Sequence, residues 1–118
     1  MIRPTSEVQV YLCRELVDMR KSVNGLSALV EGTLQLDPFA PHLFAFCNRR
    51  RNRLKILYWE RNGFVLWYKA LQKDRFPWPG ERDSDAVELT GRELNWLLDG
   101  IDIFCLKPHE ELSYDSVL

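Results

Sequence analysis

Residues 42–71 read HLFAFCNRRRNRLKILYWERNGFVLWYKAL. Three short runs of apolar and aromatic residues are separated by two polar turns, a basic one around Arg50-Arg51 and a second one at Asn62-Gly63. Asn-Gly between apolar runs is typical of a β-hairpin, because both residues tolerate the positive φ angles of tight turns. The stretch therefore predicts a three-stranded antiparallel meander with tight connections at these two places.

Apolar side chains lie on both faces of the predicted meander. A two-residue Asn-Gly turn places Tyr58 opposite Trp67 and Trp59 opposite Leu66. Strand spacing of these aromatic residues, and of Tyr68, favours a place in the core over stacking on nucleic-acid bases. Because both faces are apolar, other parts of the protein must pack against each of them. One face can take a helix that precedes the meander, and the other is left to the C-terminal helix or to a second subunit.

Two elements are expected before the meander. Residues 8–13 alternate imperfectly between apolar and polar positions and predict a first strand. A helix is expected between Asp18 and Leu36, because leucine and valine recur there at helical spacing. Asp18 or Ser22 can cap its start. Asp37-Pro38 ends it, since the residue before a proline is pushed away from helical angles.

The clearest helix start in the chain is Thr90-Gly91-Arg92-Glu93. It is a capping box, in which the threonine hydroxyl can accept from the glutamate N–H while the glutamate carboxylate reaches back. The predicted helix runs to about Asp99, and its apolar stripe consists of Leu94, Leu97 and Leu98. A short strand at 87–89 is expected before it, and an edge strand at 101–106 after it.

Together these elements predict an α+β fold, an antiparallel β-meander of about four to six strands packed with two helices. The 118 residues suffice for one domain and are too few for two, with a mobile polar tail expected from about residue 108. No apolar run reaches the ~18 residues of a membrane span, and the first residues lack a signal peptide's apolar core. The expected compartment is the cytoplasm. Three widely spaced cysteines disfavour a disulfide framework.

The formal net charge of −1 hides a strong division along the chain. Residues 1–48 carry a net charge of −1, residues 49–75 carry +7 and residues 81–118 carry −7. A local basic surface can bind polyanions whatever the total charge of the protein. Two interpretations stay open: the basic centre is free to bind a polyanion, or the acidic C-terminal third folds over it and neutralises it.

The basic turn is the feature best suited to binding a ligand, because arginine presents a planar, permanently charged fork that matches phosphate oxygens. The residues predicted to contact nucleic-acid phosphates are Arg49, Arg50, Arg51 and Arg53, with Lys55 and Arg61 as nearby support. Two other interpretations are a solvated turn that protects a sheet edge, and docking to an acidic protein. Trp78, which stands between two prolines, is predicted to be an exposed anchor for a partner protein.

No catalytic constellation is visible in the sequence. His42 and His109 are isolated and stand in no Cys/His spacing typical of zinc. The chain has no glycine-rich phosphate loop, and its carboxylates are not gathered as a metal-dependent nuclease requires. The sequence therefore predicts a protein that is not an enzyme and that uses no metal or other cofactor.

Segments along the first two thirds of the chain carry a family resemblance. They are residues 17–26, 48–59, 63–69 and 75–79. Over roughly residues 8–79 the chain resembles the small accessory protein TnpB of the IS-sixty-six type of bacterial insertion sequences. The resemblance implies a non-catalytic accessory protein for transposition, with cutting and strand transfer left to a separate transposase. The implied partners are DNA, the transposase of the same element, or both; the alternative is a protein-interaction module without direct nucleic-acid contact.

Overall fold

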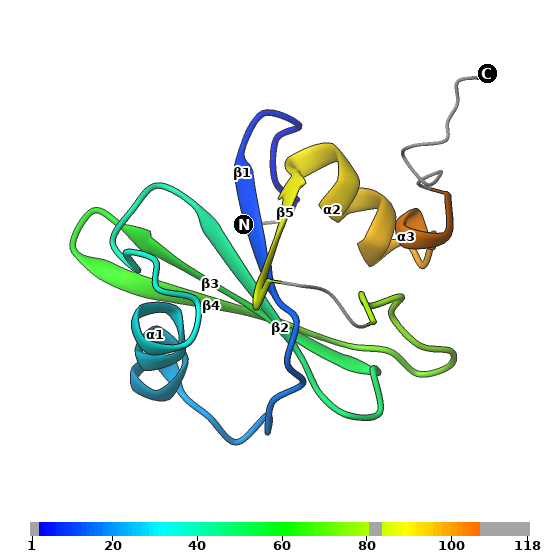
Figure 1. Ribbon diagram of the computed structural model, residues 1–118, viewed down its shortest axis with the longest axis horizontal. Helices are drawn as coiled ribbons and strands as arrows, with labels where there is room; N and C mark the ends of the chain where they lie inside the picture. The colour runs from blue at the N-terminus through cyan, green and yellow to red at the C-terminus, as the bar shows by residue number, and fades with distance from the viewer. Residues whose placement is uncertain (1–2, 81–83, 107–118) are drawn as a thin grey trace.

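A five-stranded sheet with the strand order β4-β3-β2-β1-β5 lies at the centre of the computed structural model, which describes residues 3–80 and 84–106 (Figure 1). The sheet is mixed: β1 runs parallel to β2, and the other neighbouring pairs are antiparallel. The predicted α+β fold is confirmed. The elements in chain order are β1 (Gln9–Cys13), α1 (Val23–Gly32), β2 (Leu43–Cys47), β3 (Arg53–Glu60), β4 (Gly63–Ala70), β5 (Ala86–Thr90), α2 (Gly91–Leu98) and the short α3 (Ile103–Leu106).

The predicted meander is confirmed as β2, β3 and β4, but its second turn differs from the prediction. Glu60 pairs with Gly63, so the two turn residues are Arg61 and Asn62. Arg61, rather than the glycine, takes the left-handed conformation, with φ of 57°. Gly63 instead becomes the first residue of β4.

The shifted turn moves the cross-strand pairs by two residues. Trp59 lies opposite Phe64 and Tyr58 lies opposite Val65. The rings of Trp59 and Phe64 meet edge to face with their centroids 5.0 Å apart. Such an aromatic pair stabilises a hairpin and favours this register. Because the shift is even, each side chain stays on the face it was predicted to occupy.

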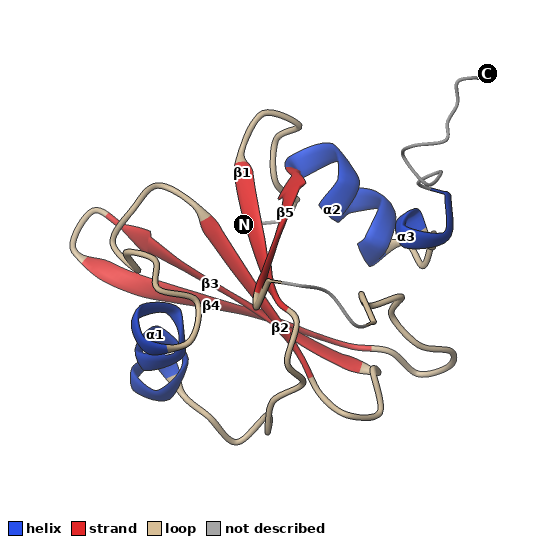
Figure 2. Cartoon of the chain, viewed as in Figure 1, coloured by secondary structure: helices blue, strands red, loops and turns tan. Residues whose placement is uncertain are grey.

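The two faces of the sheet are covered by different parts of the chain, as Figure 2 shows with α1 on one side and α2 on the other. The buried cluster on the first face brings together α1, the end of β1 and alternate residues of β2 and β3; it consists of Cys13, Val17, Leu26, Val30, Leu34, Phe44, Phe46 and Leu57. The second face is covered by α2 and by the segment after β4, with Phe76 and Trp78 in its core. The sequence left this face to the C-terminal helix or to a second subunit, and in the structure the C-terminal helix α2 covers it.

The start of α2 is built as predicted. The Glu93 backbone N–H donates to the Thr90 hydroxyl at 3.1 Å, and the Thr90 N–H donates to the Glu93 carboxylate at 2.9 Å. The capping box is confirmed, and the helix buries its predicted leucine stripe. The N-terminal segment crosses this helix start so closely that a Cβ on Gly91 would lie 1.7 Å from the Thr5 carbonyl oxygen. Asn95 also donates to the Pro4 carbonyl at 3.0 Å.

Two local predictions are corrected. The segment 101–106 is not an edge strand, because the Asp102 carboxylate accepts from the N–H groups of Phe104 and Cys105, both at 3.1 Å, and opens the short α3. Ser22 is the N-cap residue immediately before α1, as predicted, but its side chain makes no capping hydrogen bond. The expected tail from residue 108 lies outside the described residues. In the described part of the chain no helix is long and apolar enough to cross a membrane.

Candidate nucleic-acid interface

Asn48 fixes the basic turn between β2 and β3. Its side-chain oxygen accepts from the backbone N–H groups of Asn52 at 3.1 Å and Arg53 at 3.0 Å. Its amide group donates to the Asn52 side-chain oxygen at 2.9 Å. Arg51 closes the turn in the left-handed conformation, with φ of 59° and its N–H donating to the Asn48 carbonyl at 3.0 Å. The backbone that carries the arginines is therefore held by a defined set of hydrogen bonds.

The arginines of this turn differ in exposure. Arg49, Arg50 and Arg53 are exposed, whereas Arg51 is half-buried. Within residues 3–80 and 84–106, none of these four arginines forms an ion pair; the pairs in that part of the chain involve Arg3, Arg14 and Arg20. The described portion of the acidic C-terminal third therefore does not neutralise the turn.

Backbone hydrogen bonds bring a second basic segment to the same end of the sheet. The Leu71 N–H donates to the Asn52 carbonyl at 2.8 Å, and the Phe76 N–H donates to the Arg51 carbonyl at 2.6 Å. The loop between them carries Lys73 and Arg75, both exposed. These two residues were not predicted as part of the site, although their contribution to the +7 charge of residues 49–75 was visible in the sequence.

The connection between β1 and α1 adds a third basic segment. The Val17 N–H donates to the Cys47 carbonyl at 2.9 Å, and the Lys55 ammonium donates to the carbonyls of Met19 at 2.7 Å and Lys21 at 2.9 Å. We call this whole region the basic end. It comprises Arg14, Arg20, Lys21, Arg49, Arg50, Arg51, Arg53, Lys55, Lys73 and Arg75.

Two basic residues of this end are already paired. Arg14 lies 3.3 Å from the Asp85 carboxylate. The Arg20 guanidinium lies 2.7 Å from Asp18, and its hydrogen bonds, followed by the bond from the Arg20 backbone N–H, lower the Asp18 pKa to about 2. Asp18 therefore stays a carboxylate at neutral pH, bound to an arginine whose side chain is 91% exposed.

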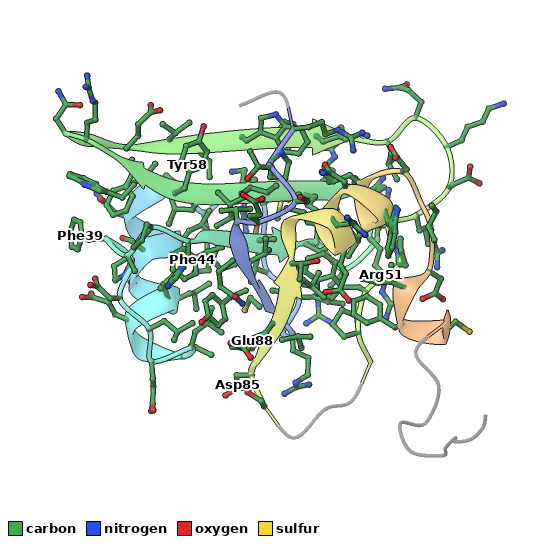
Figure 3. The ribbon with its side chains drawn as sticks, turned by 90° about the horizontal axis from the view of Figure 1, so that it is seen from above. Phe39, Phe44, Arg51, Tyr58, Asp85 and Glu88 are labelled. Carbon is green, nitrogen blue, oxygen red and sulfur yellow. The ribbon has the colours of Figure 1, made fainter. Side chains whose placement is uncertain are left out.

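Arg61 does not support the basic turn. It lies in the β3–β4 turn, whereas Arg53 begins β3 at the other end. Eight steps along a strand at about 3.3 Å each put the two residues roughly 25 Å apart. In Figure 3, Arg51 and Tyr58, a residue of β3 close to the β3–β4 turn, lie in opposite halves of the molecule. Arg53 and Arg61 are close in sequence, but the extended strand β3 places them at opposite ends of the hairpin.

The prediction that Trp78 is an exposed anchor is wrong. Its side chain is only 6% exposed and belongs to the core beneath the sheet. The indole N–H donates to the Cys13 carbonyl at 3.1 Å, which satisfies the ring's single donor inside the protein. The flanking prolines lead the chain across the sheet face, so the tryptophan fills that face rather than leaving it.

Hollows surround the basic turn. One of about 560 Å³ is lined by Asp18, Met19, Arg20, Arg53, Lys55 and Tyr68. A second of about 340 Å³, on another side of the turn, is lined by Arg14, Glu15, Leu16, Arg49, Arg51, Pro79 and Gly80. Tyr68 was predicted to be in the core, but its side chain is 47% exposed because β4 is an edge strand and α1 does not extend over this end.

An aromatic cluster lies at the opposite end of the sheet. Phe39, which is 52% exposed, packs against Trp59 and Phe64 with ring centroids 5.0 Å and 5.3 Å away. No local sequence pattern indicates this cluster, because Phe39 comes from the loop before β2. It forms a second surface feature, distinct from the basic end.

Cys13, Cys47 and His42 lie among packed side chains of the core or its border. Burial, the main cause in both cases, raises the pKa of Cys13 to about 11 and the pKa of Cys47 to about 12. Both side chains are therefore protonated thiols at neutral pH. The His42 ring contacts those of Tyr11 and Phe44, with centroids 5.3 Å and 6.3 Å away. Among the described residues, no group of three or more His, Cys, Asp or Glu side chains is placed to hold a metal ion.

Comparison with known proteins places the chain in a family. Residues 8–108 match the family described as IS66 Orf2 like protein, so the match continues past residue 79 and includes α2. The chain is 33% identical over 102 residues to the uncharacterized protein y4jC of Sinorhizobium fredii (strain NBRC 101917 / NGR234), covering 86% of each chain. It is 31% identical over 102 residues to the uncharacterized protein y4hO of the same organism, covering 86% of this chain and 88% of that one. No solved structure matches. The chain therefore belongs to the IS66 Orf2-like family, a family of insertion-sequence accessory proteins.

Proposed function

We propose that this chain is a non-catalytic accessory protein of transposition that binds the phosphate backbone of DNA through its basic end. The observation that carries the proposal is the turn Arg49–Arg53. Its arginines have no carboxylate partner in the described part of the chain, and Asn48 holds their backbone in place. Leaving guanidinium groups unpaired on a fixed turn suits the binding of an external anion.

Phosphate contact of this kind has recognisable consequences. Phosphates position a protein on DNA without reading its bases, so binding through this turn is weakly selective for sequence. It is also sensitive to salt, because each neutralised phosphate releases bound counterions. Lys73 and Arg75 extend the same surface and add to both effects.

An alternative is contact with the transposase of the same element, without direct contact to DNA. The observation that favours it is the aromatic cluster of Phe39, Trp59 and Phe64 at the opposite end of the sheet. Half-exposed aromatic rings are common anchors in protein interfaces. The two functions are compatible in space, because the two surfaces lie at opposite ends of β3.

The test is fluorescence anisotropy with a labelled duplex at several salt concentrations. The unmodified protein should show log K falling with log salt at a slope of roughly −3 to −4, if about four phosphates are neutralised. The quadruple variant Arg49→Ala, Arg50→Ala, Arg51→Ala, Arg53→Ala should bind more weakly and with a flatter slope. A double variant, Arg61→Ala with Arg92→Ala, removes two exposed arginines outside the basic end and is the matched control for the double variant Arg49→Ala, Arg50→Ala.

Equal affinity and equal slope for the unmodified protein and the quadruple variant would refute the proposal. An equal loss of affinity in the two double variants would also refute it, because binding would then respond to total charge rather than to this turn. In either case the transposase contact becomes the favoured function. A pull-down of the purified transposase, with Phe39→Ala as the variant, then tests it directly.

A further inference from the structure

The sheet face on the α1 side changes character along β3 and β4. Under α1 the face is apolar, with Leu57 fully buried and paired with Leu66. Two residues further toward the basic end, the same face presents the pair Lys55 and Tyr68. Arg53, which also points to this face because side chains alternate along a strand, comes next. Beyond the part of the face that α1 covers, the side chains on this face are therefore basic and aromatic instead of apolar.

A hollow of about 560 Å³ opens over this part of the sheet. Its volume falls in the range of roughly 300–1,000 Å³ typical of ligand pockets, but it is a surface groove open to solvent rather than an enclosed cavity, which suits part of a longer chain better than a small enclosed ligand. Its rim is the segment around Met19, which the Lys55 ammonium fastens to the sheet through the carbonyls of Met19 and Lys21. A buttressed rim and a floor of β-strand give the hollow a defined shape.

The lining of the hollow combines an aromatic ring with basic side chains. The Tyr68 ring is nearly half exposed, with the Lys55 ammonium 5.9 Å from its centroid. Arg20 and Arg53 carry exposed guanidinium groups on its border. Asp18 is the one carboxylate among the lining residues; Arg20 already holds it, and its oxygens can still accept from an N–H group of a ligand. The lining keeps an excess of basic over acidic side chains.

We propose that this hollow binds an unpaired nucleotide of single-stranded DNA, with the base stacked on Tyr68, an adjoining phosphate on Arg53, and a further contact from the N–H groups of Arg20 that Asp18 leaves free. An aromatic ring inside a basic groove is the arrangement by which proteins hold single strands, since every base offers a flat face for stacking. In a duplex that face is covered by the neighbouring base pairs, so duplex DNA gains nothing from Tyr68. This inference rests on the proposed function, because the same basic end supplies the phosphate contacts.

The test compares single-stranded and duplex DNA on the same set of variants. The probes are a fluorescein-labelled oligothymidylate of about 12 nucleotides, a length within the range of known single-strand sites, and a labelled duplex of equal length. The variants are Tyr68→Ala, Tyr68→Phe and Trp96→Ala. Trp96 is the control because it is 43% exposed and lies on α2, outside the basic end.

Tyr68→Ala should weaken oligothymidylate binding about tenfold, the usual scale for one stacked base, and leave duplex binding unchanged. Tyr68→Phe keeps the ring and should bind as the unmodified protein does, as should Trp96→Ala. A second measurement needs no variant: oligothymidylate containing one 5-iodouracil is photocrosslinked to the unmodified protein, and mass spectrometry should locate the crosslink at Tyr68.

The outcomes separate the two proposals. If the protein binds the duplex but Tyr68→Ala leaves oligothymidylate binding unchanged, or if the crosslink maps outside the hollow, the nucleotide site is refuted and the phosphate-binding function stands. If Tyr68→Ala weakens both probes equally, the site is refuted as well, because stacking would affect the single strand alone. If the protein binds neither probe, the proposed function fails and the nucleotide site fails with it.

Discussion

Replacing Asn48 by alanine should loosen the basic turn without removing any charge. The substitution deletes two hydrogen bonds from backbone N–H groups and one bond to the Asn52 side chain. Each contributes about 0.5–1.5 kcal/mol, and partial exposure lets water replace some of that stabilisation. We therefore expect the free energy of unfolding to fall by about 2 kcal/mol, which corresponds to a drop in Tm of roughly 8 °C for a chain of this size.

Urea unfolding followed by tryptophan fluorescence measures this change, since the chain contains four tryptophans. Asn52→Ala removes only one of the three bonds and should cost about 1 kcal/mol or less. Arg50→Ala is the matched surface control and should stay within about 0.5 kcal/mol of the unmodified protein.

The same variant links the turn to binding. Asn48→Ala keeps all arginines, so any loss of affinity for duplex DNA measures the value of holding them in place. An unfolding free energy within about 0.5 kcal/mol of the unmodified value would refute the view that Asn48 organises the turn. A stability loss without any change in affinity would show that the arginines bind equally well from a disordered turn.

Two further predictions concern α2 and the absence of catalysis. Thr90→Ala removes the hydroxyl of the capping box and should cost about 1 kcal/mol, and an unchanged Tm would show that this cap adds nothing to stability. The purified chain should neither nick nor join DNA in the presence of magnesium or manganese, because its sequence gathers no carboxylates for a metal-dependent reaction. Metal-dependent nicking that persists through purification and is lost in a carboxylate variant would overturn this expectation.

Local signals explain which parts of the fold the sequence predicts. The β2–β4 meander follows from turn residues next to short apolar runs, and the start of α2 follows from hydrogen bonds between Thr90 and Glu93, three residues apart. The turn at Arg61-Asn62 was misplaced because the Asn-Gly signal competes with the pairing of Trp59 and Phe64. That pairing depends on side chains outside the turn.

The location of the basic residues in the fold could be predicted only in part, for the same reason. The arginines of the basic turn are adjacent in sequence and were visible, whereas Arg75 joins them through backbone contacts of its loop with the turn. Trp78 is buried by packing against residues distant in sequence, and its indole N–H donates to the Cys13 carbonyl, 65 residues away; no local pattern signals either. The exposure of Tyr68 could not be predicted, because its spacing matches that of a core residue and the part of the sheet that α1 covers was not known.

The pairing of β1 with β5 determines when this protein can finish folding during its synthesis. Gln9 pairs with Thr90, so β1 has no antiparallel partner until the later segment β5 has been synthesised. The strand pairs of the meander involve no residue beyond Ala70, so they can form before the later segments have been synthesised. Until residues 86–98 emerge, the outer edge of β1 has no partner and one face of the sheet lacks its helix. The nascent chain therefore presents an open strand edge and an apolar face for chaperones to protect.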